Sequence, residues 1–340
     1  MDEVIDALEQ ALADTGSVAV TPRGGFALEN ERTGVLEWMP AIRPGRTATV
    51  KTVAYNPENP QRHRLPTIMA CTAVHDSRTG ALTALLDATF TTALRTGAAS
   101  AVATRRLARV GSAVVGLVGC GAQAVSQLHA LSRVLTVRRV LAYDTDPAVL
   151  SSFPARTAFS GLPVEPCDLP ALEAAADVIC TATSARVGAP PVLRGDPDRL
   201  RPGVHINAVG SDLPGKTELP LALLRAAVVC PDYLPQAAVE GECQQLSGEE
   251  IGPSLAELVA GEAGEQLRDR LTVFDSTGFA LEDQVVTEVV LAHARRLGAG
   301  SPLPLFTGTS DPRNPYWLSE PDAELPAPDP APPAALAPVR

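Results

Sequence analysis

The first third of the chain shows two different periods of hydrophobic residues. Residues 2–14 carry apolar side chains at helical spacing, and this pattern predicts a short amphipathic helix. Residues 34–55 predict two strands separated by the turn Arg43-Pro-Gly-Arg46. Two further apolar segments between residues 65 and 87 flank a turn at residues 77–80 and predict a hairpin.

A lysine lies inside the second of these strands. Alternation along Thr47–Tyr55 turns Thr49, Lys51 and Val53 to the same face. Because removing a charged group from water is costly, we expect Lys51 to face a functional site or solvent.

A long helix is predicted for residues 89–109, which are rich in alanine and other small residues. Arg95 lies near its beginning. A guanidinium near a helix N-terminus is suited to binding an anion, and an exposed arginine on a connecting helix is the alternative.

From residue 113 onward, short apolar strands alternate with helices. This alternation predicts a parallel sheet with helices on both faces, a doubly wound α/β arrangement of the Rossmann type. The predicted strands are 113–118, 139–143, 164–165, 177–180, 205–208, 227–230 and 271–274, and the predicted helices include 123–135 and 281–297.

Composition restricts the class of partner. Among 340 residues, 28 are basic and 39 acidic, and the net charge of −11 argues against a nucleic-acid surface. The six cysteines follow no zinc-binding spacing, so we expect reduced thiols, no bound metal and a cytoplasmic protein. We also expect no signal peptide and no membrane helix. Residues 321–340 contain seven prolines and predict a disordered tail.

A glycine motif, Gly119-x-Gly121-x-x-Ala124, directly follows the strand at 113–118. Such glycines permit a tight turn and bring the backbone close to a pyrophosphate at a helix N-terminus. The next strand ends at Asp144, where an acid binds ribose hydroxyls and repels a 2′-phosphate, so NAD is favoured over NADP. A coincidental strand-turn-helix is the alternative. The predicted contacts to NAD in this region are Gly119, Gly121, Ala122, Gln123 and Asp144.

Later strands of the same sheet end in residues suited to the rim of the cofactor crevice, with ordinary loop residues as the alternative. These are Thr181, Thr183, Asn207, Val209 and Gly210. Asp212 follows at the same rim, so a lone carboxylate is predicted beside the reactive end of the cofactor. It is the first candidate for the residue that defines the chemistry.

Taken in order, these motifs resemble the ornithine cyclodeaminase/μ-crystallin family, and within it most closely the lysine cyclodeaminases of actinomycete biosynthetic pathways. The resemblance covers about residues 15–300. Its strongest segments are GVLEWMP, VKTVAYNPEN, LPTIMA, TTALRTGAASAVATRRLAR, GCGAQAVSQLHALSRVL, AYDTDP, NAVGSDLPGKTEL, VEGECQQL and LTVFDSTGFALED.

The resemblance implies a redox-neutral reaction with tightly held NAD. The α-carbon of a basic amino acid gives up a hydride, the ω-amine attacks the resulting imine, ammonia leaves, and the hydride returns to the ring. Lysine gives pipecolate in this way, and ornithine gives proline. Ring closure needs a neutral ω-amine, whose ordinary pKa is about 10.4, so a general base is required.

The resemblance also assigns residues to this chemistry. Arg23, Lys51 and Arg95 match the positions that bind the α-carboxylate, and Lys51 can also transfer protons. Asp212 matches the general base. Four further matches have less defined roles: Glu37 and Thr67 near the substrate, with a strand-edge glutamate and a core threonine as alternatives, and Lys216 and Ser276 near the nicotinamide.

Several functions on this fold stay open. The first hypothesis is cyclodeamination of L-lysine, and the second is cyclodeamination of L-ornithine. The other hypotheses are a ketimine reductase or amino-acid dehydrogenase, a non-catalytic NAD-binding protein like the crystallins, and an enzyme that ligates two amino acids. The resemblance further implies a homodimer formed through strands of the first domain. We expect residues 1–106 with 281–320 to form an α+β domain for substrate binding and dimerisation, and residues 107–280 to form the NAD-binding domain.

Overall fold

The computed structural model describes residues 1–28, 34–261, 263–303, 305, 309, 311–314 and 316. The chain forms two compact units, residues 1–290 and residues 291–340, and both sheets lie in the first unit. The tail predicted at residues 321–340 lies outside the described residues, as does part of the segment 304–320.

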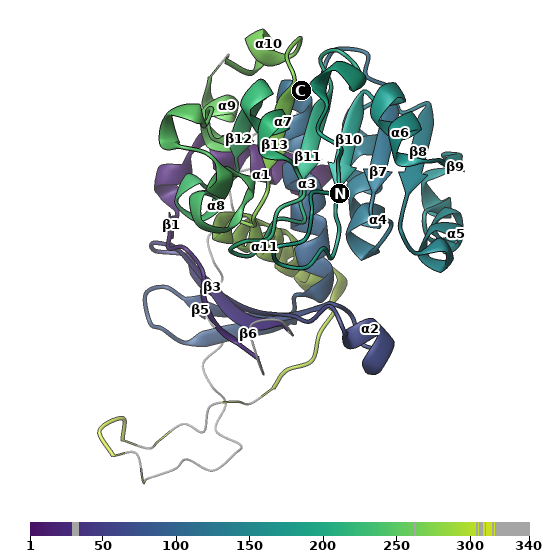
Figure 1. The fold of residues 1–340 in the computed structure, drawn as a ribbon. Helices are drawn as coiled ribbons and strands as arrows, with labels where there is room; N and C mark the ends of the chain where they lie inside the picture. The colour runs from purple at the N-terminus through teal and green to yellow at the C-terminus, as the bar shows by residue number, and fades with distance from the viewer. Residues whose placement is uncertain are drawn as a thin grey trace. The chain divides into compact units, whose positions relative to one another are not determined.

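An antiparallel sheet of six strands is formed by the N-terminal part of the chain (Figure 1). Its strands are β1 (Ala19–Val20), β2 (Gly24–Ala27), β3 (Val35–Arg43), β4 (Thr47–Tyr55), β5 (Ile68–Asp76) and β6 (Leu82–Asp87). The order is β1-β3-β4-β5-β6, with β2 pairing with β3. The predicted turns therefore join β3 to β4 and β5 to β6, and the strand predictions are confirmed.

Helices cover one face of this sheet. They are α1 (Asp2–Ala13), α3 (Thr89–Leu107) and the N-terminal part of α11 (Ala280–Leu297). Met39 and Val53 on the sheet share one hydrophobic core with Leu8, Ala98 and Leu281 on these helices. Thr49, Lys51 and Val53, which are predicted to share one face of their strand, are all buried, so Lys51 does not face solvent.

Helix α3 lies between the two sheets, in contact with β5 on one side and with β11 and β13 on the other. The small residues predicted there make this close packing possible. A Cβ at Gly97, for example, would lie 2.7 Å from the carbonyl oxygen of Ser126 on α4.

A parallel sheet of seven strands carries the predicted nucleotide loop (Figure 1). Its strands are β7 (Val114–Val118), β8 (Arg139–Tyr143), β9 (Val164–Pro166), β10 (Val178–Thr181), β11 (His205–Ala208), β12 (Val228–Pro231) and β13 (Thr272–Asp275). Their order is β12-β13-β11-β10-β7-β8-β9. The order reverses between β7 and β10, and ligands of such sheets bind at the carboxyl ends of the strands at this reversal.

The remaining elements connect these strands or cap their ends. The helices are α2 (Asn59–Arg62), α4 (Ala122–Val134), α5 (Pro147–Arg156), α6 (Leu169–Ala175), α7 (Leu221–Ala226), α8 (Leu234–Glu240), α9 (Leu255–Ala260) and α10 (Ala263–Leu267). Short 3-10 turns are Thr15–Ser17, Ala158–Ser160, Pro197–Arg199, Glu242–Gln245 and Gly248–Glu250. The predicted α/β fold with a doubly wound sheet and an α+β part is confirmed.

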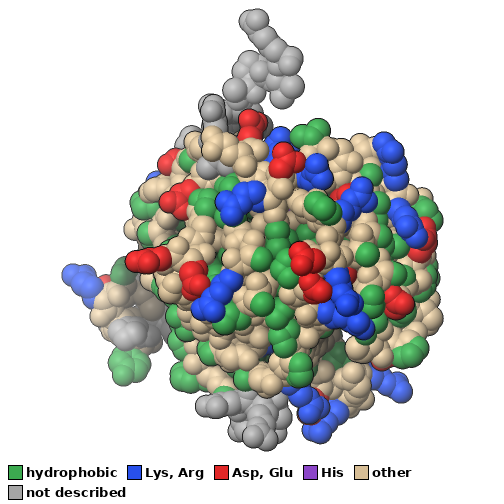
Figure 2. Space-filling view, turned by 45° about the horizontal axis from the view of Figure 1, so that its top comes forward, with side chains coloured by type: hydrophobic (Ala, Val, Ile, Leu, Met, Phe, Trp, Pro, Cys, Tyr) green, Lys and Arg blue, Asp and Glu red, His purple; other side chains and the backbone are tan. Residues whose placement is uncertain are grey.

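Charged side chains of both signs are interspersed on the face drawn in Figure 2. Neighbouring opposite charges partly cancel, so this face presents no broad field of one sign. No helix among the described residues is long and apolar enough to cross a membrane.

Candidate active site

The glycine loop has the shape that a pyrophosphate needs. Gly119 directly follows β7 with φ +86°, and a Cβ there would lie 2.6 Å from the carbonyl oxygen of Ala182. Gly121 precedes α4, and a Cβ there would meet no atom within 4 Å. The first glycine is thus required by the backbone, whereas the second leaves open space before the helix N-terminus formed by Ala122 and Gln123.

Asp144 braces this loop from the end of β8. Its Oδ2 accepts a hydrogen bond from the backbone N–H of Cys120 at 2.7 Å, and Oδ1 accepts one from the N–H of Asp146 at 2.8 Å. A carboxylate has about four acceptor sites, so ribose hydroxyls can still donate to it. The predicted position of Asp144 at the cofactor edge is consistent with this geometry.

The ends of β10 and β11 are joined at the rim. The N–H of Val209 donates to the carbonyl of Thr181 at 2.9 Å. Thr181, Thr183 and Gly210 all donate to the carboxylate of Glu218, a residue that the sequence reasoning missed.

Two of the predicted rim residues differ in where their side chains lie. Asn207 is predicted to line the cofactor crevice, but its side chain is fully buried: Nδ2 donates to Thr104 Oγ1 on α3 at 3.0 Å, and Oδ1 lies 3.2 Å from His205 Nε2. It connects β11 to α3, because alternation along the strand turns its side chain toward that helix. The Ser276 hydroxyl is buried and has no hydrogen-bond partner among the described residues, so it is available to a ligand.

Lys51 and Arg95 come together in the buried layer between the antiparallel sheet and α11. Lys51 Nζ lies 2.7 Å from each carboxylate oxygen of Asp283, and Arg95 Nε lies 3.5 Å from Asp283 Oδ1. Arg95 Nη1 also donates to Glu282 Oε2 at 3.0 Å. The alternative of an exposed Arg95 is excluded, since its side chain is 8% exposed.

Burial shifts the pKa values of two groups in this cluster, Lys51 and Glu282. It lowers the pKa of Lys51 to about 8, against the opposing effect of Asp283, and the nearby Arg95 charge lowers it further. Burial raises the pKa of Glu282 to about 8, although Arg95 opposes the change. These two groups therefore titrate close to neutral pH.

Arg23 connects the antiparallel sheet to the rim of the parallel sheet. Its Nη2 donates to the backbone carbonyl of Asp212 at 2.6 Å, and its Nε lies 2.7 Å from Glu240 Oε1 and 3.5 Å from Glu37 Oε1. Burial raises the pKa of Glu240 to about 7 and also raises the pKa of Glu37, in both cases against the charge of Arg23. Glu240 was not singled out from the sequence, although it lies in the segment VEGECQQL.

Asp212 pairs with a second lysine. Lys216 Nζ donates to Asp212 Oδ1 at 2.8 Å and lies 4.9 Å from the centre of the Tyr55 ring. Burial by itself would lower the pKa of Lys216, but the Asp212 carboxylate and Tyr55 outweigh it, and the pKa is raised. The Asp212 side chain keeps 25% of its surface exposed, so a substrate group can reach it.

Thr67 lies half-buried just before β5. Its backbone carbonyl accepts a hydrogen bond from the N–H of Asn56 at 2.8 Å, which ties the segment to the end of β4. This contact supports a structural role for the backbone, and a substrate contact of its hydroxyl stays a prediction.

Arg23, Lys51 and Arg95 are buried cations of the kind that can bind a carboxylate, and the partly exposed Asp212 carboxylate belongs to the residue whose backbone Arg23 contacts. No group of three or more His, Cys, Asp or Glu side chains within the described part of the chain could hold a metal ion. The lysine, arginine and carboxylate side chains gathered here are of the kinds that bind charged groups and transfer protons.

The chain is similar to known proteins over most of its length. An L-lysine cyclodeaminase from Streptomyces rapamycinicus is 45% identical over 94% of this chain and 93% of its own length. An alanine dehydrogenase from Archaeoglobus fulgidus is 37% identical over 90% of this chain and 94% of its own length.

A solved structure of a lysine cyclodeaminase, described for its recognition of L-lysine, L-ornithine and L-2,4-diaminobutyric acid, superposes with a TM-score of 0.90. It is 50% identical and covers 94% of this chain and 93% of that one. The model of the ornithine cyclodeaminase/mu-crystallin family matches residues 1–297. The chain belongs to the ornithine cyclodeaminase/mu-crystallin family.

Proposed function

We propose that this protein is an NAD-dependent lysine cyclodeaminase, which converts L-lysine to L-pipecolate and ammonia without net oxidation. The similarity to lysine cyclodeaminases over nearly the whole chain supports this activity. The observation that carries it in the structure is the bond from Arg23 to the Asp212 backbone, because it joins the cation cluster to the cofactor rim.

NAD fits the residues present at the rim. The open space at Gly121 and the unpartnered Ser276 hydroxyl are suited to the pyrophosphate and the nicotinamide end, respectively. Bound NAD⁺ supplies a hydride acceptor for the α-carbon and a hydride donor for the cyclic imine. Asp144 would hold the adenosine ribose, and its charge disfavours NADP.

Arg23, Lys51 and Arg95 would hold the α-carboxylate of the amino acid. Two guanidinium groups can form paired hydrogen bonds to a carboxylate, and the lysine adds a compact charge. With the carboxylate fixed, the α-carbon is oriented toward the cofactor rim and the side chain extends toward Asp212.

Asp212 would act as the general base for ring closure. It would accept the proton of the ω-ammonium group, and Lys216, which donates to its Oδ1, would orient the carboxylate. Glu37 and Glu240 lie against Arg23 and would hold its guanidinium in place.

Two other activities have specific support. Ornithine cyclodeamination to proline is the second candidate, because one methylene changes binding by only about 1–3 kcal/mol. A ketimine reductase or dehydrogenase is the third candidate, since an alanine dehydrogenase is similar in sequence to this protein over 90% of the chain.

The test is incubation of the purified protein with L-lysine or L-ornithine without an added hydride acceptor. We expect pipecolate and ammonia in equal amounts from lysine and no accumulation of NADH. Stoichiometric NADH without a cyclic product would instead indicate a dehydrogenase, and proline formed faster than pipecolate would make ornithine the preferred substrate.

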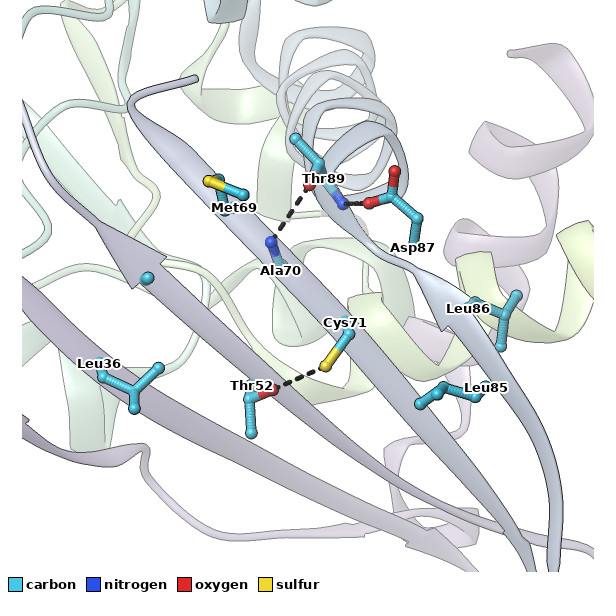
Figure 3. Close-up of a pocket in the computed structure, with 10 residues that line it drawn as sticks. Leu36, Thr52, Met69, Ala70, Cys71, Leu85, Leu86, Asp87 and Thr89 are labelled. Carbon is cyan, nitrogen blue, oxygen red and sulfur yellow. Dashed lines mark hydrogen bonds between the residues drawn. The ribbon is translucent and has the colours of Figure 1, made fainter. Parts of the chain in front are cut away.

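We further propose a cytoplasmic homodimer that forms through the outer face of the antiparallel sheet. Leu36, Met69 and Leu85 on this face help to line a groove of about 540 Å³ (Figure 3). Apolar side chains on the strands of this face are at least 36% exposed. They are Leu36, Trp38, Val50, Met69 and Leu85. Light scattering of wild type and Leu85→Glu tests the proposal: a dimer that dissociates in the variant supports it, and a monomeric wild type contradicts it.

A further inference from the structure

Glu218 is a fully buried carboxylate on the loop between β11 and α7. Its Oε2 accepts hydrogen bonds from Thr181 Oγ1 at 2.6 Å and from the Gly210 N–H at 2.9 Å. Its Oε1 accepts from the N–H and from Oγ1 of Thr183, both at 2.7 Å. Four donors from the ends of two neighbouring strands thus converge on one side chain.

The carboxylate has no substitute of equal shape at this position. Glutamine would offer one oxygen and an NH₂ group, and in either orientation the NH₂ group would face a backbone N–H, of Thr183 or of Gly210, that cannot accept from it. Asparagine or aspartate would be too short to reach both strand ends. Gly210 also depends on this arrangement, since a Cβ there would overlap the Glu218 carboxylate.

The backbone of Glu218 is itself held by a second buried acid. Its N–H donates to Glu242 Oε1 at 2.6 Å, and the N–H of Glu242 donates to Asp275 Oδ1 at 2.9 Å. Asp275 ends β13 and immediately precedes Ser276. The position of Glu218 is therefore fixed from the strand that carries another predicted cofactor contact.

The two segments that Glu218 joins, after β10 and after β11, lie next to the glycine loop and to Asp212. Ala182, between Thr181 and Thr183, lies against the position where a Cβ of Gly119 would be. Gly210 lies two residues before Asp212. A change at Glu218 would therefore alter the glycine loop and the general base together.

We infer that Glu218 is the positioning residue that sets the spacing of the β10 and β11 ends around the nicotinamide half of NAD. The inference rests on the proposed function for the identity of the cofactor. Glu218 touches no reacting atom; it acts through Thr181, Thr183 and Gly210.

The test compares Glu218→Gln with Glu173→Gln by calorimetry of NAD⁺ binding in the absence of any amino acid. Glu173 is a matched control, because it too is buried and accepts a backbone hydrogen bond, from Arg194 at 2.8 Å, but does not contact the rim. We expect Glu218→Gln to weaken NAD⁺ binding on the order of 10-fold to 100-fold, as for loss of a buried hydrogen bond to a charged group. We expect Glu173→Gln to lower the melting temperature and leave NAD⁺ affinity unchanged.

A second set of variants separates positioning from charge and from folding. Glu218→Asp keeps the charge but not the reach, so it should bind NAD⁺ as weakly as the glutamine variant and lower kcat more than it changes the KM for lysine. If Glu218→Gln does not fold, Thr181→Val is the variant to measure. It removes one of the four hydrogen bonds to Glu218 with little change in volume, and it should weaken NAD⁺ binding by a smaller factor.

Wild-type NAD⁺ affinity in folded Glu218→Gln, or in Thr181→Val, would overturn the inference. A wild-type protein that binds NAD⁺ but makes no pipecolate would contradict the proposed function and leave this inference standing.

Discussion

Replacement of Asp283 by asparagine should move the alkaline limit of the reaction to lower pH. Asp283 holds Lys51 through two contacts of 2.7 Å, and its charge is the main effect that raises the pKa of this buried lysine. At an effective dielectric constant of about 20, a pair at this distance interacts by about 6 kcal/mol. Asparagine keeps one of the two hydrogen bonds, and loss of the other, between charged groups, costs about 1.5–3 kcal/mol, which lowers the pKa of Lys51 by about 1–2 units.

The assay is kcat/KM for lysine as a function of pH, which reports on the free enzyme. In wild type, the pKa of Lys51 near 8 predicts a fall in kcat/KM as pH rises through that value, because the carboxylate loses one of its cations. In Asp283→Asn the fall should come about 1–2 units earlier. The substrate's own titration is the same for both proteins and cancels in the comparison.

Glu288→Gln supplies the control on the same helix. Glu288 accepts from Thr47 Oγ1 at 2.9 Å and lies 3.4 Å from Arg43 Nε, away from Lys51. Its removal should leave the alkaline limb where it is in wild type. Coincident profiles for Asp283→Asn and wild type would refute the reasoning, because Asp283 would then not set the charge of Lys51.

The lowered pKa of Lys51 also affects the stability of the fold. The pKa of Lys51 is about 8 in the folded protein and near its ordinary value of 10.5 in the unfolded chain. Between these values the unfolded chain binds more protons, so the contribution of Lys51 to the free energy of unfolding rises with pH. It is fully present above about 10.5 and is lost as pH falls to about 8.

Three further predictions follow from the site. Asp212→Asn should bind NAD⁺ normally by calorimetry yet lose pipecolate formation by about 100-fold or more, as expected for a general base; full activity would remove it from that role. Arg95→Ala should raise the KM for lysine by at least about 10-fold, and an unchanged KM would exclude it from the carboxylate site. Burial raises the pKa of Glu240 from 4.5 to about 7. The folded protein therefore holds this proton more tightly than the unfolded chain, and the resulting stabilisation is present below about pH 4.5 and lost as pH rises through about 7. Chemical denaturation at several pH values should show that Glu240→Gln removes this fall in the free energy of unfolding with pH. If the fall is the same as in wild type, Glu240 is not its source.

The strands and helices could be predicted because each carries a local signal. Alternation along β4 predicted that Lys51 shares a face with Thr49, and both are buried in the structure. Glycine spacing and the acid at the end of β8 likewise predicted the nucleotide loop. These patterns act over a few residues, where side-chain direction follows directly from backbone geometry.

The counter-ions could not be predicted in the same way. Asp283 follows Lys51 by 232 residues, and Glu240 follows Arg23 by more than 200, so only the fold brings each pair together. Glu218 looks like an ordinary loop acid in the sequence. The direction of the Asn207 side chain also depends on the fold: it lies at the end of β11, and its amide donates to Thr104 on α3.

The buried acids also account for how one site can accept a carboxylate and an ammonium group together. Four cations form ion pairs with five carboxylates: Arg23, Lys51, Arg95 and Lys216 with Glu37, Asp212, Glu240, Glu282 and Asp283. Burial raises the pKa of Glu240 to about 7 and that of Glu282 to about 8, so these two can hold protons near neutral pH. A dibasic amino acid brings one net positive charge, which favours release of such a proton, whereas a neutral amino acid brings none. On the proposed function, preference for a diamino acid therefore arises from acids that titrate beside Arg23 and Arg95, and the length of the side chain is left to the shape of the pocket.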